Sequence, residues 1–202
     1  MDKVKLYLIN SSLIKDRYDQ ILSFVDESRR EKALRYQNEK DRLLSLGAAY
    51  LLKKYLPVGE IKENSNGKPY LANGPFFNLS HSGEYIVLGV HSSKDIGVDI
   101  EQINESKINA IKYVLNGVEK NEEDTNVLFQ MWTNKESIIK CLSSGLKDIK
   151  TVDALPLEGS RLINGEHYFT KSILMNGYSL SITLKEKASF EIETNDIKTL
   201  NI

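Results

Sequence analysis

The stretch Gly97-Val98-Asp99-Ile100-Glu101 is the most informative part of this sequence for both fold and chemistry. Apolar branched residues alternate with carboxylates, which is the period-two pattern of a β-strand with one buried face. In such a strand Asp99 and Glu101 point to one face, while Val98 and Ile100 point to the other. Carboxylates this close repel each other unless a cation or a proton lies between them. The pattern therefore has two interpretations: a Mg²⁺ site, because Mg²⁺ prefers oxygen ligands, or a solvated edge-strand face.

Strand-like and helix-like segments alternate on both sides of this stretch. Residues 4–9 predict an opening strand, and residues 16–55 have the spacing of two or three helices, with an almost wholly apolar helix over 43–56. Helix-like sequence returns over 104–142, interrupted by a polar loop at 119–126. Further strand-like runs lie at 76–79, 85–91, 96–101, 168–175, 178–184 and 189–193. This order predicts an α+β fold of two similar α/β halves, residues 1–101 and 102–202, packed as one body.

The composition narrows the class of protein. The 202 residues include 27 basic and 28 acidic side chains, and this near-neutral total argues against a broadly basic nucleic-acid binder. The single cysteine, Cys141, cannot form an internal disulfide. No apolar run approaches the ~20 residues of a membrane span. We therefore expect a globular, cytoplasmic protein that binds neither nucleic acid nor membrane.

A second candidate site lies on the helix predicted over residues 131–140. Trp132, Glu136 and Lys140 are spaced at i, i+4 and i+8, so they form one stripe on that helix. One interpretation is a surface Glu-Lys pair beside a core tryptophan. The other is that Glu136 adds a third carboxylate to the metal site and that Lys140 meets a phosphate. The spacing alone leaves both open.

Several further residues could contact an anion. His81 lies in the run Asn78-Leu79-Ser80-His81-Ser82, where adjacent serine and histidine side chains diverge, so a hydrolytic triad is not expected. His81 could contact a phosphate or pack as a structural histidine. Lys68 lies in a rigid Asn-Gly-Lys-Pro turn that could present one cation. The basic run of Arg29, Arg30, Lys32 and Arg35 is either an anion site or a solvated helix face.

In this order the segments resemble the 4'-phosphopantetheinyl transferase superfamily, in its larger monomeric class. That class acts on carrier proteins of nonribosomal peptide, polyketide and fatty-acid synthesis. The resemblance spans roughly residues 29 to 146. Its motifs are Asn66-Gly67-Lys68-Pro69, Phe77-Asn78-Leu79-Ser80-His81-Ser82, Gly97-Val98-Asp99-Ile100-Glu101 and Trp132-x-x-Lys135-Glu136-Ser137-x-x-Lys140.

The resemblance implies a substrate, a partner and a fold. Coenzyme A would donate 4'-phosphopantetheine to a serine of an apo acyl or peptidyl carrier protein, and 3',5'-ADP would leave. The family fold is two similar α/β halves with coenzyme A at their junction, and the family is monomeric. The cofactor would be Mg²⁺, with Mn²⁺ as an alternative.

The resemblance also implies a role for each matching residue. Asp99, Glu101 and Glu136 would hold the metal, and Glu136 is the first choice for the general base, with Glu101 as its rival. Lys140 and His81 would contact coenzyme A phosphates. The remaining nucleotide contacts would come from Lys68 and Ser80, from Lys32 with Arg35 or Arg30 at the 3'-phosphate, and from Arg42, where the register is ambiguous by one residue.

Two other functions compete with this one. A Mg²⁺-dependent phosphohydrolase could use the same three carboxylates on a nucleotide or pyrophosphate substrate, and it would need no acceptor. A catalytically inactive homologue could bind a carrier protein without chemistry. Loss of a metal carboxylate would favour the inactive homologue, but all three candidate carboxylates are present.

Overall fold

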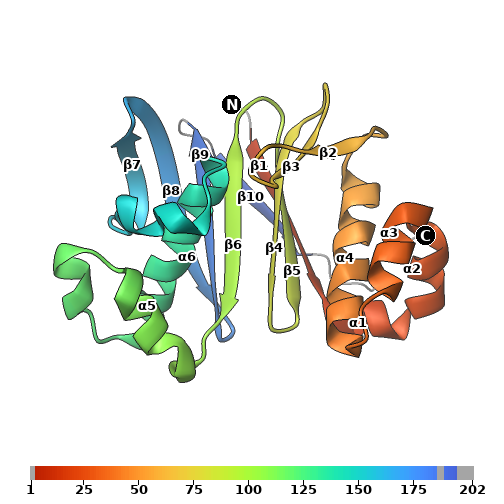
Figure 1. Cartoon of the computed structure of the whole chain (residues 1–202), viewed down its shortest axis with the longest axis horizontal. Helices are drawn as coiled ribbons and strands as arrows, with labels where there is room; N and C mark the ends of the chain where they lie inside the picture. The colour runs from red at the N-terminus through yellow and green to blue at the C-terminus, as the bar shows by residue number, and fades with distance from the viewer. Residues whose placement is uncertain (1–2, 186–188, 195–202) are drawn as a thin grey trace.

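The computed structural model of the protein describes residues 3–185 and 189–194. Two β-sheets lie at the centre, with helices α1–α4 on one side and α5 and α6 on the other (Figure 1). The fold is therefore α+β, as the sequence predicts. The helices described are α1 (Ser11–Asp16), α2 (Tyr18–Phe24), α3 (Glu27–Leu34), α4 (Glu39–Tyr55), α5 (Ile108–Val114) and α6 (Thr125–Cys141), with 3₁₀ helices η1 (Glu105–Lys107), η2 (Gly117–Asn121) and η3 (Leu146–Thr151).

The described strands form two four-stranded sheets and one short hairpin, β2–β3. The strand order is β10-β1-β5-β4 in the first sheet and β6-β9-β8-β7 in the second. Neighbouring strands are antiparallel except β1 and β10, which are parallel. The strands are β1 (Lys3–Asn10), β2 (Ile61–Glu63), β3 (Pro69–Leu71), β4 (Phe76–Ser82), β5 (Tyr85–His91), β6 (Ile96–Gln102), β7 (Glu158–Ile163), β8 (Glu166–Met175), β9 (Tyr178–Lys185) and β10 (Ser189–Thr194).

The two sheets share one connectivity. In the first, β1 is followed by α1–α4 and later by the hairpin β4–β5, whose second strand pairs with β1. In the second, β6 is followed by α5 and α6 and later by the hairpin β8–β9, whose second strand pairs with β6. Strand pairing places β6 in the second sheet, ahead of the division between residues 101 and 102 that the sequence predicts. That division remains a prediction.

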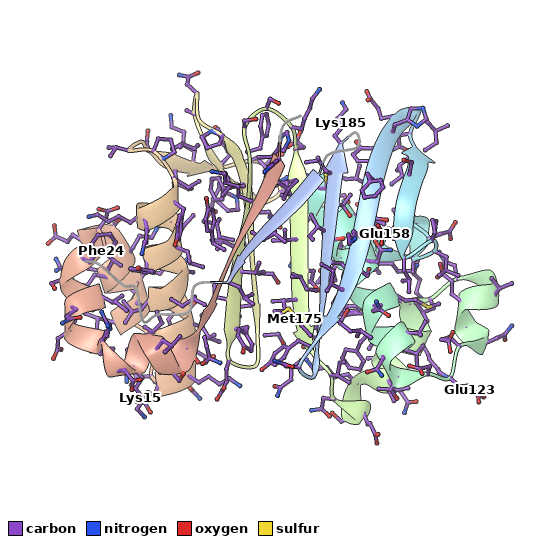
Figure 2. All side chains as sticks on the ribbon, turned by 180° about the vertical axis from the view of Figure 1, so that it is seen from behind. Lys15, Phe24, Glu123, Glu158, Met175 and Lys185 are labelled. Atoms are coloured by element: carbon purple, nitrogen blue, oxygen red, sulfur yellow. The ribbon has the colours of Figure 1, made fainter. Side chains whose placement is uncertain are left out.

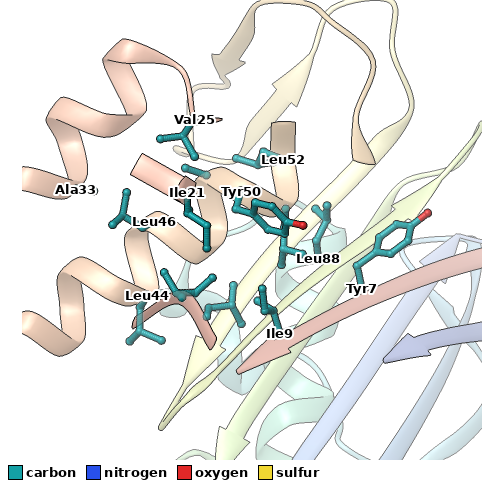
Figure 3. Close-up of a cluster of buried hydrophobic side chains, with 14 of the residues drawn as sticks. Tyr7, Ile9, Ile21, Val25, Ala33, Leu44, Leu46, Tyr50, Leu52 and Leu88 are labelled. Carbon is teal, nitrogen blue, oxygen red and sulfur yellow. The ribbon is translucent and has the colours of Figure 1, made fainter. Parts of the chain in front are cut away.

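The first hydrophobic core lies between α4 and the first sheet. Figure 3 shows Tyr50 of α4 beside Leu88 of β5, and Ile9 of β1 belongs to the same cluster. Helix α4 begins after Asn38, whose side-chain oxygen accepts a hydrogen bond from the Lys40 amide (2.8 Å). Because α4 contacts both the sheet and helices α1–α3, it is apolar almost all round, which confirms the prediction for residues 43–56.

The second core fills the space between the two sheets. Val98 and Ile100 of β6 are buried there beside Leu6 of β1, Val87 of β5 and Ile182 of β9. Because side chains alternate along a strand, the carboxylates of β6 project from its opposite face. This opposite face of β6 meets α6 and β4. The two helical layers lie at opposite ends of the molecule, with Phe24 on one side and Glu123 on the other (Figure 2).

The local predictions agree with the structure over residues 16–55 and differ from it elsewhere. Residues 16–55 hold α2, α3 and α4, which confirms the prediction of two or three helices, whereas α1, over Ser11–Asp16, is not predicted. The strands β2, β3 and β7 were not anticipated, because runs of three to six residues carry little periodicity. Within the predicted polar loop 119–126, Glu119 is buried in η2.

Candidate active site

Asp99 lies at the junction of β4, β6 and α6. Its Oδ1 accepts hydrogen bonds from Ser80 Oγ of β4 (2.8 Å) and from Lys140 Nζ of α6 (2.6 Å). Only 5% of Asp99 is exposed, so the solvated-edge interpretation is wrong for this residue. Its Oδ2 is buried and accepts no hydrogen bond from any residue that the structure describes. Burial raises the pKa of Asp99, and the ammonium of Lys140 opposes that shift.

Glu101 is held in a similar way, two residues further along β6. Its Oε1 accepts hydrogen bonds from Ser82 Oγ (2.5 Å) and from Lys107 Nζ (2.6 Å). Each carboxylate of β6 therefore meets one serine of β4 and one lysine. Lys107 is half exposed, whereas the side chain of Glu101 is largely covered.

A third carboxyl group, that of Glu136, interacts electrostatically with both carboxylates of β6. Glu136 is 8% exposed on α6, one turn before Lys140. Burial, together with the negative charges of Asp99 and Glu101 and against the opposing charge of Lys140, raises the pKa of Glu136 to about 7. These four charged groups therefore interact electrostatically, which excludes the interpretation of Glu136 and Lys140 as a solvated surface pair.

The carboxyl groups of Asp99, Glu101 and Glu136 are chemically suited to bind a hard divalent cation. Their oxygens are the ligands that Mg²⁺ prefers, and the buried Asp99 Oδ2 lacks a partner among the described residues. Among the side chains of residues 3–185, no three acidic, histidine or cysteine residues are already grouped as metal ligands. The ammonium of Lys140 instead lies against Asp99 Oδ1. Cation binding would therefore require these side chains to rearrange, with Lys140 giving up part of its contact with Asp99.

A cavity of about 350 Å³ opens beside this junction, between α3, α4 and β4. Of the basic residues proposed from the sequence, Lys32 and His81 line it, together with Arg29. Arg29 and Lys32 are three residues apart and so share a face of α3, which the helical spacing could have indicated. Arg30 and Arg35 are not among its lining residues, and Arg42 donates from Nη1 to Tyr36 O (3.1 Å).

The same cavity also contains carboxylates that sequence reasoning missed. Asp41 of α4 and Glu63 of β2 line it along with the basic side chains. Burial lowers the pKa of His81, and the nearby charge of Lys140 lowers it further, while Asp41 acts in the opposite direction. His81 is therefore neutral at neutral pH and can act there as a hydrogen-bonding group rather than a fixed cation.

Lys68 and Ser80 are not among the residues that line this cavity. Lys68 and Lys140 line a smaller hollow of about 240 Å³, and Lys68 Nζ lies 3.6 Å from Asp95 Oδ1. Ser80 is buried, and its hydroxyl also accepts hydrogen bonds from Lys140 Nζ (3.1 Å) and Ile100 N (3.4 Å). The structure thus groups Ser80 with Asp99, where the sequence suggested a nucleotide contact.

Helix α6 is fixed on its inner face by small hydroxyl residues. Thr133 hydrogen-bonds to Ser179 and Ser181 (2.8 and 2.7 Å), and Ser137 to Thr183 (2.8 Å). A Cβ on Gly97 would collide with the backbone at Ser137 O and Cys141 N, so glycine is needed where β6 meets α6. This close packing fixes how far Glu136 and Lys140 of α6 lie from β6.

A buried ion pair fixes another face of helix α6. Lys135 is fully buried, donates from Nζ to Val152 O (2.6 Å) and lies 3.6 Å from Glu119 Oε2. Glu119 in turn accepts hydrogen bonds from the amides of Ala154 and Asn116 (2.5 and 2.9 Å). Lys135 therefore ties α6 to the segment after η3, and it does not reach the carboxyl groups of β6.

The same carboxyl-bearing segments match a known family. A model of the 4'-phosphopantetheinyl transferase superfamily matches residues 95–189, which include β6, α6 and the four charged residues described above. This part of the chain is similar to the 4'-phosphopantetheinyl transferase superfamily.

Proteins similar to this chain carry the same description. The chain is 31% identical over 144 residues to the 4'-phosphopantetheinyl transferase gsp of Aneurinibacillus migulanus, covering 64% of this chain and 60% of the relative. It is 30% identical over 145 residues to a 4'-phosphopantetheinyl transferase of Bacillus subtilis, covering 63% and 64%. With Sfp of Bacillus subtilis strain 168 it shares 26% over 162 residues, 71% and 72% of the two chains. The matches thus span less than two thirds of the first two relatives.

Proposed function

We propose that this chain transfers 4'-phosphopantetheine from coenzyme A to a serine of an apo carrier protein, in a Mg²⁺-dependent reaction that releases 3',5'-ADP. The observation that supports it best is that the buried Oδ2 of Asp99 has no hydrogen-bond partner among the described residues, while the charges of Glu136 and Lys140 lie close to this carboxyl group. The superfamily match covers these same residues, and its relatives bear the name of this activity. Among the described helices none is long and apolar enough to cross a membrane.

In the proposed reaction, the carrier serine oxygen forms a bond to the β-phosphorus of coenzyme A as the bond to 3',5'-ADP breaks. Glu136, which lies one turn before Lys140 on α6, accepts the serine proton; Glu101 is the alternative base. Asp99, Glu101 and Glu136 would hold the cation, whose chemistry when bound is neutralisation of pyrophosphate charge. Lys140 would turn from Asp99 to a phosphate oxygen.

The adjoining cavity would hold the nucleotide end of coenzyme A. Lys32 and Arg29 supply positive charge there, and His81 supplies a neutral hydrogen-bonding group. Lys68 would approach the substrate from the smaller hollow that it shares with Lys140. The same proposal includes Mn²⁺ as an alternative cation, a monomeric state and a cytoplasmic location. Its carrier proteins would be those of nonribosomal peptide, polyketide or fatty-acid synthesis.

The common connectivity of the two sheets supports a duplicated architecture. We propose that β1–α4–β4–β5 and β6–α6–β8–β9 are equivalent units related by a pseudo-two-fold axis. The proposed active site then lies where the edge strands of the two units, β4 and β6, meet.

The transfer can be tested with coenzyme A, Mg²⁺ and a panel of apo carrier proteins, followed by mass spectrometry of the carriers. We expect a phosphopantetheine adduct with wild type and with the control Glu158→Ala, whose carboxylate is exposed on β7. We expect none with Asp99→Ala. Full-rate transfer by Asp99→Ala would contradict the metal site, and cleavage of coenzyme A without an adduct would favour a phosphohydrolase. Binding of a carrier without chemistry would favour an inactive homologue.

A further inference from the structure

Strands β4 and β6 are joined by side chains, although they belong to different sheets. The amides of Val98, Ile100 and Gln102 in β6 donate hydrogen bonds to side chains of β4. The acceptors are Asn78 Oδ1 for Val98 N (2.9 Å), Ser80 Oγ for Ile100 N (3.4 Å) and Ser82 Oγ for Gln102 N (3.1 Å). Each successive contact lies two residues further along both strands, so β4 and β6 run parallel. Alternate side chains of β4 replace the backbone hydrogen bonds that would join two strands of one sheet.

Two of these side chains also hold the carboxylates. Ser80 donates to Asp99 Oδ1 (2.8 Å), and Ser82 donates to Glu101 Oε1 (2.5 Å). A hydroxyl has one proton to donate, and an amide that donates to its oxygen leaves that proton free. In the case of Ser82, the Gln102 amide thereby helps to direct the hydroxyl proton at Glu101.

We propose that Ser82 is a positioning residue, which fixes Glu101 for a divalent cation in the way that Ser80 fixes Asp99. This inference rests on the proposed function, since it assigns Glu101 to a cation site. A glutamate has three side-chain torsions, and ordering them costs conformational entropy when the cation binds. The contact from Ser82 restricts those torsions beforehand, so cation binding loses less entropy.

Lys107 has the opposite effect on the cation in this arrangement. Its ammonium occupies the same oxygen of Glu101, at 2.6 Å, and half of its side chain is exposed. The ammonium of Lys107 stabilises the carboxylate when no cation is bound, and its positive charge repels an approaching cation. Removal of Lys107 should therefore tighten cation binding, whereas removal of the Ser82 hydroxyl should weaken it.

The test is a titration of the full-length protein with Mn²⁺ alone, with free Mn²⁺ measured by electron paramagnetic resonance. We expect Ser82→Ala to raise the Kd about tenfold, the usual scale for a residue that supports a metal ligand. Ser82→Thr, which keeps the hydroxyl, should restore most of the affinity. Lys107→Ala should lower the Kd about threefold. Ser160→Ala, on exposed β7 of the second sheet, is the matched control and should match wild type.

Each outcome bears on a different part of the inference. If Ser82→Ala binds Mn²⁺ as wild type does, or if Ser82→Thr is as weak as Ser82→Ala, the role of Ser82 is wrong while the cation site stands. If wild type does not bind Mn²⁺, the cation site of the proposed function and this inference both fail. If Ser82→Ala does not fold, the other two variants still test the inference. Wild-type affinity for Mn²⁺ in Ser82→Thr and tighter binding in Lys107→Ala would support it. Weaker binding of Mn²⁺ in either variant would overturn it.

Discussion

Lys140 Nζ lies 2.6 Å from Asp99 Oδ1, while the other oxygen of Asp99 is buried without a hydrogen-bond donor among the described residues. The positive charge of Lys140 thus offsets the negative charge of Asp99 and so stabilises the buried carboxylate on β6. In the proposed reaction the cation takes over that role, and Lys140 becomes available to the substrate. Lys140 therefore links the stability of the metal-free protein to its chemistry.

Replacing Lys140 by methionine should lower the stability of the metal-free protein by about 2 kcal/mol, because Asp99 then lacks its balancing charge. Mg²⁺ should raise the Tm of Lys140→Met more than that of wild type. Lys171→Met, which removes an exposed partner of Glu158, is the control and should cost at most about 0.5 kcal/mol. Thermal unfolding with and without Mg²⁺ measures both, and an equal Mg²⁺ shift in Lys140→Met and wild type would count against this role.

The raised pKa of Glu136 predicts a fall in stability with rising pH. In the unfolded chain this carboxyl loses its proton near the ordinary value of 4.5, but in the folded protein it does so at about 7. Between these values the folded state binds more protons, so the free energy of unfolding decreases as the pH rises. The buried Asp99, with a pKa raised by burial, acts in the same direction.

Urea unfolding in EDTA, at several values between pH 5 and pH 8, tests this prediction. Glu136→Gln should flatten much of the decline below pH 7, whereas Glu158→Gln should keep the wild-type profile. Mg²⁺ should bind more tightly as the pH rises through 7, since the cation competes with the proton on Glu136. A wild-type stability that climbs over this range would show that Glu136 is already ionised at pH 5.

Asp41 should weaken binding of the 3'-phosphate of the nucleotide. It lines the proposed nucleotide cavity together with Arg29 and Lys32, and an exposed charge some way from the ligand changes affinity by under about 1 kcal/mol. Asp41→Asn should therefore bind 3',5'-ADP about threefold more tightly, with a smaller gain for 5'-AMP. Asp19→Asn, on α2, is the control. Calorimetry at low salt measures the affinity of wild type and of both variants for each nucleotide, and equal gains for both nucleotides would place the 3'-phosphate away from Asp41.

Gly97→Ala should destabilise the fold by about 3 kcal/mol, because the new methyl group would meet the backbone of α6 at Ser137 and Cys141. Gly145→Ala is a matched control, since its Cβ would meet only Lys147 Cγ at 3.8 Å. Chemical unfolding compares the two variants. A Gly97→Ala protein as stable as the control would mean that α6 can move away from β6 without loss.

Much of this site was predictable from local pattern. Alternation along residues 97–101 puts Asp99 and Glu101 on one face of a strand, and helical spacing puts Glu136 and Lys140 on one stripe. Both statements depend only on the geometry of one element. The same helical spacing would have chosen Arg29 over Arg30 as the partner of Lys32, had it been applied to α3.

The contacts between elements could not be predicted in this way. Ser82 reaches Glu101, and Lys135 reaches Glu119, only because segments distant in sequence approach one another. A buried lysine such as Lys135 looks in sequence like any solvated helix residue, and its burial depends on carbonyls of the segment after η3. Strand pairing between β6 and β9 likewise has no local signal.

The central claim is that coenzyme A is cleaved only by transfer to a carrier serine. Its most direct test is the amount of 3',5'-ADP formed by the protein with coenzyme A and Mg²⁺, measured beside the amount of modified carrier. We predict equal amounts of both products with an apo carrier, and no 3',5'-ADP when the carrier serine is replaced by alanine. Release of 3',5'-ADP at the same rate without that serine would contradict the claim and identify a hydrolase.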